Sequence, residues 1–180
     1  MFILYAIPIG IAAGLALGGH LDRLADVRFV WAPVAIVGLL VQLVLFSTPL
    51  ADMVGDAGPV LYVASTGIVL VAVLRNLRIP GMALVALGAA SNLLAIVANG
   101  GVMPASPEAV AALGQEAAEG FSNSVVMTDP ALRPLTDLFA LPAWLPGANV
   151  FSVGDVLIGI GVAVVIALGM RGSRERAGSS

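Results

Sequence analysis

Residues 150–170 read VFSVGDVLIGIGVAVVIALGM, and Asp155 is the only charged side chain in this stretch. A run of this kind has the ~17–25 mostly apolar residues that a membrane-spanning helix needs. Four uncharged runs precede it, Phe2 to Gly19, Phe29 to Phe46, Pro59 to Leu74 and Pro80 to Ala98. Such runs are expected to be helices, because hydrocarbon offers no hydrogen-bond partners and each backbone N–H and C=O group must bond within its own segment. The sequence therefore predicts an all-α integral membrane protein, a five-helix transmembrane bundle spanning residues 2–19, 29–46, 59–74, 80–98 and 150–170.

The composition of the 180 residues supports the same class of protein. Hydrophobic residues make up 59% and charged residues 11%, whereas soluble domains have about 45–50% and about 25%. The mean hydropathy is +1.04. These values argue against a water-soluble globule, disorder and nucleic-acid binding. Because the chain has no cysteine and one histidine, thiolate catalysis, zinc-thiolate sites and polyhistidine metal sites are excluded, and we expect neither a metal nor a cofactor.

The arginines predict an orientation, since positive charge is enriched in cytoplasmic loops. All eight basic residues are arginine, and seven follow the first, third or fifth run: Arg23, Arg28, Arg75, Arg78, Arg171, Arg174 and Arg176. Only Arg133 lies elsewhere. The pattern predicts a multi-pass protein of the bacterial cytoplasmic membrane, with its N-terminus outside and its C-terminus in the cytoplasm. Residues 1–170 form the single transmembrane domain, and residues 171–180 are expected to be a disordered cytoplasmic tail.

The connection over residues 99–149 is long enough to have its own structure. Ser106, Pro107 and Glu108 are typical of a helix start, and a second start is expected after Asp129 and Pro130. We expect a helical outer loop, serving either as a cap over a cavity or as a connector along the lipid surface. Trp144 is expected at the level of the lipid headgroups.

Small residues recur along the first run at four-residue intervals, with Gly10, Gly14 and Gly18 on one helical face. Such a face lets another helix backbone approach closely. The partner is either a helix of the same chain or a second copy, so a homo-oligomer through these glycines is one expectation.

Polar residues within the runs are the first candidates for a binding site, because hydrocarbon penalises polar groups that lack a partner. They gather in the outer halves of the predicted spans, and we expect them to line an outward-facing pocket: Gln42, Ser91, Asn92, Asn99, Ser152 and Asp155. Asp155 has two interpretations. Ser152-x-x-Asp155 is typical of a capping box, in which the carboxylate bonds to its own helix start, and the same carboxylate is the best catalytic candidate.

Two resemblances rest on short motifs. NGGVMP at residues 99–104 and NVFSVGDVLI at residues 149–158, in this layout, resemble a family of uncharacterised bacterial multi-pass membrane proteins along nearly the whole chain. In addition, GAASNLLAI at 88–96, GGV at 100–102 and FSVGD at 151–155 are similar to the Gly-Asn-x-x-Asp-Arg, Gly-Gly-Val and Phe-Asn-x-Ala-Asp motifs of lipoprotein signal peptidases.

The second resemblance implies an aspartic hydrolase, in which one carboxylate is the base and a protonated one is the acid. Asp155 and Asn92 match family residues, but Ala95 stands where the second aspartate belongs. An outer-loop carboxylate, Asp129 or Asp137, would have to replace it.

We therefore expect a non-enzymatic binding or accessory protein with a polar pocket. Its expected partners are membrane lipids, a lipid or peptide ligand, or another membrane protein, and not nucleic acid. The alternative is a membrane-embedded hydrolase that uses Asp155 with a loop carboxylate.

Overall fold

The computed structural model describes residues 2–45, 55–113 and 124–172. Five of its helices are long: α1 (Ala6–Ala16), α2 (Ala32–Leu45), α4 (Gly58–Leu74), α5 (Met82–Ala98) and α8 (Val153–Gly169). The shorter elements are η1 (Phe2–Tyr5), η2 (Leu21–Asp26), η3 (Gly55–Ala57), β1 (Met103–Ala105), α6 (Pro107–Leu113), β2 (Ser124–Val126), η4 (Arg133–Leu135), β3 (Phe139–Ala140) and β4 (Val150–Phe151).

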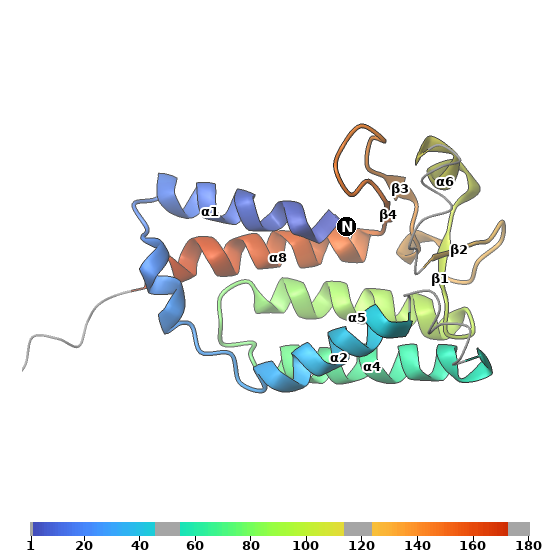
Figure 1. Cartoon of the computed structure of the whole chain (residues 1–180), viewed down its shortest axis with the longest axis horizontal. Helices are drawn as coiled ribbons and strands as arrows, with labels where there is room; N and C mark the ends of the chain where they lie inside the picture. The colour runs from blue at the N-terminus through green and yellow to red at the C-terminus, as the bar shows by residue number, and fades with distance from the viewer. Residues whose placement is uncertain (1, 46–54, 114–123, 173–180) are drawn as a thin grey trace, which may run out of the picture.

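The long helices lie next to one another in the order α1, α8, α5, α4, α2, and each neighbouring pair in this order is in contact. Figure 1 shows α6 and the strands gathered at one end of these helices, where α5 ends and α8 begins. We call residues 103–113 and 124–151 the cap. The cap thus rests on the ends of the two central helices.

Two small sheets hold the cap together. β1 pairs with β2 in parallel, with Met103 opposite Ser124, and β3 pairs with β4 in antiparallel. An additional bridge joins Ala105 to Asp137. α6 contributes Ala109 and Leu113 to an apolar cluster. The cap is therefore a small packed unit.

The predicted five-helix transmembrane bundle is wrong. In the described parts of the chain, none of the helices combines the length and the apolar character required to cross a membrane. The longest, α4, α5 and α8, have 17 residues each. The all-α class is also wrong because of the two sheets. The predicted multi-pass location in a cytoplasmic membrane, with its orientation, is contradicted by the same finding.

The span predicted at 59–74 matches α4, whereas the other four predicted spans were too long, because local backbone geometry divides the uncharged runs. Trp31 has a φ of 64° and Gly81 a φ of 95°, so α2 begins at Ala32 and α5 at Met82. In the last run, Val150–Phe151 form a strand and Ser152 caps the helix that follows. Apolar composition marks where helices form, but these turns set their lengths.

The loop predictions had mixed outcomes. The helix start at Ser106 is confirmed, since the Ala109 N–H donates to Ser106 Oγ at 3.0 Å and α6 follows. The helix expected after Pro130 is wrong, because Leu132 has a φ of 52° and only the short η4 forms before β3. Trp144 is 80% exposed, and residues 173–180 of the expected tail lie outside the described residues.

Small residues allow α1 to approach α8. A Cβ on Gly10 would meet the Ala163 backbone, and one on Gly14 would meet the Met170 side chain. Both glycines are buried. The stripe therefore serves packing within the chain at these two positions, and an oligomer through it stays a prediction.

At the end opposite the cap, Asn76 fixes the turn before α2. Its side chain accepts from the Val30 N–H at 2.7 Å and donates to the Val30 and Ala72 carbonyls at 2.8 and 2.7 Å. Arg75 lies over the Trp31 ring, 4.7 Å from its centroid. These contacts hold Trp31 in its unusual left-handed conformation.

Candidate functional site

Asp155 is both a helix cap and a link between the two central helices. Its Oδ2 accepts from the Ser152 N–H at 3.1 Å, and the Asp155 N–H donates to Ser152 Oγ at 3.1 Å, which completes a capping box. Its Oδ1 accepts from Asn92 Nδ2 on α5 at 2.9 Å, and Ser152 Oγ donates to Asn92 Oδ1 at 2.8 Å. The predicted capping box is confirmed, and Asn92 extends it across the α5–α8 contact.

Glycines bring these side chains within reach. A Cβ on Gly88 would overlap the Gly154 carbonyl, and a Cβ on Gly154 would overlap the Asn92 amide. The absence of side chains at both positions lets α5 and α8 touch directly beneath the cap. The bond between Asn92 and Asp155 depends on this close approach.

The other predicted site residues lie in different places. Gln42 donates to Thr66 at 3.2 Å, between α2 and α4. Asn99 bonds to the Ala131 carbonyl and N–H, at 2.9 Å each, and so ties the cap to the end of α5. Ser91 Oγ is buried and has no hydrogen-bond partner in the described structure. A ligand-binding role for any of them stays a prediction.

Asp137 is a buried acid at the centre of the cap. It is 3% exposed, its N–H donates to the Pro104 carbonyl at 2.9 Å, and its carbonyl accepts from the Ser106 N–H at 2.9 Å. Its carboxyl group accepts a hydrogen bond from Ser124 Oγ. Backbone and side chain together join three segments of the cap.

Burial raises the pKa of Asp137 to about 7, because the surrounding protein disfavours the charged carboxylate. The hydrogen bond from Ser124 opposes this rise in pKa, and the negative charge of Asp155 adds to it. The two carboxyl groups therefore interact electrostatically. Near neutral pH a substantial fraction of Asp137 is protonated.

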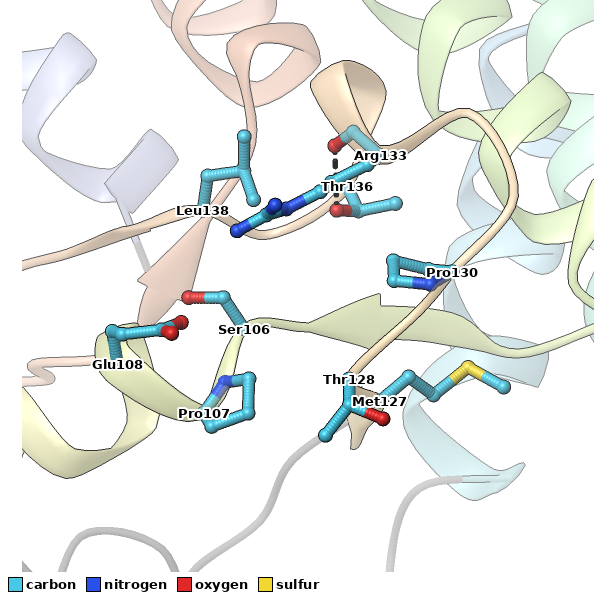
Figure 2. Close-up of a pocket in the computed structure, with 9 residues that line it drawn as sticks. All are labelled: Ser106, Pro107, Glu108, Met127, Thr128, Pro130, Arg133, Thr136 and Leu138. Atoms are coloured by element: carbon cyan, nitrogen blue, oxygen red, sulfur yellow. Dashed lines mark hydrogen bonds between the residues drawn. The ribbon is translucent and has the colours of Figure 1, made fainter.

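A pocket of about 90 Å³ lies on the cap (Figure 2). Its walls come from the start of α6, the segment after β2 and the segment around η4: Ser106, Pro107, Glu108, Met127, Thr128, Pro130, Arg133, Thr136 and Leu138. Asp155 and Asn92 do not line it. Sequence reasoning did not expect this site, although Arg133 was the one arginine outside the pattern of the others.

The fold and the pocket define a class of protein in which a layer of helices supports a small mixed cap that carries a polar cavity. The chain belongs to a family of unknown function (DUF5317), whose model matches residues 26–167. No curated protein and no solved structure matches the chain. Membership of an uncharacterised family is thus confirmed, while the resemblance to lipoprotein signal peptidases stays a prediction.

Proposed function

We propose that this protein binds a small polar ligand in the cap pocket. The observation that carries the proposal is the lining of the pocket, where Arg133 and Glu108 lie together with the hydroxyl groups of Ser106, Thr128 and Thr136. Small-molecule sites place a few polar groups at fixed positions to orient a ligand. A cavity lined in this way suits binding rather than packing.

Fixed backbone supports the walls of the pocket. Ser106 is held by its bond from the Ala109 N–H, and Thr136 Oγ1 donates to the Arg133 carbonyl at 2.8 Å. The neighbouring Asp137 backbone bonds to Pro104 in β1 and to Ser106, which follows β1. Because these groups are positioned in the free protein, a ligand does not have to order them on binding.

The proposal is tested by filling the pocket. Thr128→Trp places an indole at the pocket wall, and Val125→Trp is the matched control because Val125 is 48% exposed and does not line the pocket. Saturation-transfer NMR against a panel of small polar compounds is expected to give signals with wild type and Val125→Trp, and none with Thr128→Trp. Equal signals from Thr128→Trp would place binding elsewhere and refute the proposal.

A second function, acid–base hydrolysis, is favoured by the electrostatic interaction between Asp137 and Asp155. An aspartic mechanism needs one carboxyl group protonated and one ionised, and the raised pKa of Asp137 supplies a protonated partner. It ranks second because both oxygens of Asp155 already accept protein hydrogen bonds and neither acid lines the pocket.

Hydrolysis is tested by incubating the protein with prolipoprotein and lipid-like esters. Turnover is expected to vanish in both Asp155→Asn and Asp137→Asn and to persist in Asp129→Asn, which changes an exposed acid of the same loop. Turnover that survives either of the first two substitutions would exclude this acid pair.

A further inference from the structure

The pocket presents one positive and one negative side chain that are not neutralised by each other. In the described structure neither Arg133 nor Glu108 forms an ion pair. Figure 2 shows the Arg133 guanidinium and the Glu108 carboxylate directed toward the side of the pocket from which Ser106 projects. A ligand with two opposite charges would complement both.

The hydroxyl groups of Ser106 and Thr136 add one hydrogen-bond donor and one acceptor to the pocket. Ser106 Oγ accepts from the Ala109 N–H, so its own O–H is left to donate. Thr136 Oγ1 donates to the Arg133 carbonyl, so its lone pairs are left to accept. Ser106 lies at the start of α6 with Glu108, and Thr136 is bonded to the Arg133 carbonyl, so each charged residue has a hydroxyl group in its own segment.

The volume limits the ligand to a few heavy atoms. The cavity of about 90 Å³ is well below the roughly 300–1,000 Å³ of pockets that enclose drug-sized ligands. A whole nucleotide or lipid chain could not be enclosed by it. A free amino acid with a very small side chain combines the required charges with a suitable size.

We propose that the cap pocket binds a small zwitterion, an amino acid of the size of glycine or alanine. Its carboxylate would contact Arg133, and its ammonium group would contact Glu108. The inference rests on the proposed binding function and specifies its ligand class. Both charged residues are exposed, so water screens them and the expected Kd is on the order of 1 mM.

The test compares three ligands of similar size on the full chain by NMR titration. Alanine carries both charges, propionate carries only the negative charge, and ethylamine carries only the positive charge. Alanine is expected to bind about tenfold more tightly than either of the others, because each of them leaves one charged group of the pocket without a partner.

Two substitutions assign the charges. In Arg133→Gln, alanine is expected to bind no better than ethylamine, and in Glu108→Gln no better than propionate. The exchange of both charges, Arg133→Glu with Glu108→Arg, is expected to recover part of the alanine affinity that each single reversal loses. Arg28→Gln and Asp26→Asn are controls, since both residues are exposed and do not line the pocket.

The outcomes separate this inference from the function on which it rests. If propionate or ethylamine binds as tightly as alanine, the zwitterion is refuted while binding in the pocket stands. The zwitterion is also refuted, and binding in the pocket stands, if alanine, propionate and ethylamine do not bind but other compounds give signals that Thr128→Trp removes. If Thr128→Trp leaves all binding unchanged, both the function and the ligand class are refuted.

Discussion

Most aspartates make a folded protein less stable as the pH falls, but Asp137 should make this protein less stable as the pH rises. Asp137→Asn should remove this loss of stability. The pKa of Asp137 is about 7 in the folded chain, against 3.8 without the protein environment. Between these two pH values the unfolded chain has released this proton and the folded chain has retained it. The contribution of Asp137 to stability is therefore complete below about pH 4, falls as the pH rises to about 7, and is constant above that.

The magnitude follows from the width of this window. One pKa unit corresponds to ~1.36 kcal/mol, so the rise from 3.8 to about 7 corresponds to about 4 kcal/mol. At low pH, protonated Asp137 and the asparagine that replaces it are both neutral and similar in shape, and the two proteins should agree within about 1 kcal/mol. At about pH 8 the variant should be more stable by about 4 kcal/mol, because it buries no charge.

The measurement is chemical denaturation of wild type and Asp137→Asn at several pH values between about 4 and 8. Taking the difference between the two proteins cancels the other titrating groups. Asp129→Asn, measured in the same series, is the control for replacing an exposed acid of the same loop. A flat difference for Asp137→Asn, or one that decreases as the pH rises, would refute the reasoning.

Three further predictions concern the contact between α5 and α8. Asp155→Asn removes the negative charge that helps to raise the pKa of Asp137, so the upper end of the pH window should move to lower pH in the same denaturation series. Ser152→Ala removes the helix cap and leaves Asn92 Oδ1 without its donor, and should cost about 1–3 kcal/mol in the free energy of unfolding. Gly154→Ala forces a methyl group against the Asn92 amide and should lower stability by about 1–3 kcal/mol; a melting temperature equal to that of wild type would contradict the close packing.

Local sequence signals predicted the local features of this fold. The starts of α6 and α8 were both predicted from the sequence, because a helix cap needs only a serine and neighbouring residues within one turn. The uncharged runs marked where the long helices form. The run 59–74 predicted α4 to within one residue. The start of α2 was not predictable, because Trp31 is held in a left-handed conformation by the distant Asn76 and Arg75.

The candidate site was harder to predict because its parts meet through tertiary contacts. Asp137 was one of two loop acids that the signal-peptidase resemblance left open, and only the pairing of its backbone with β1 shows why it is buried. The β3–β4 pairs, Phe139 with Phe151 and Ala140 with Val150, join residues 12 and 10 positions apart that show no strand alternation. Glu108 was interpreted as a helix-start residue, and the approach of Arg133 to the same pocket has no signature in the sequence.

The two candidate functions share one segment of backbone, which allows a single substitution to separate them. Thr136 lines the pocket and Asp137 is the buried acid, and the backbone of Asp137 is bonded to β1. Asp137→Asn keeps those backbone bonds, so the pocket should retain its shape and its ligand. It also removes the group that would donate a proton in hydrolysis. If wild type shows no hydrolytic activity and both wild type and Asp137→Asn bind the ligand, binding in the pocket is favoured. If wild type hydrolyses a substrate and Asp137→Asn does not, while both bind the ligand equally, the acid pair acts independently of the cap pocket.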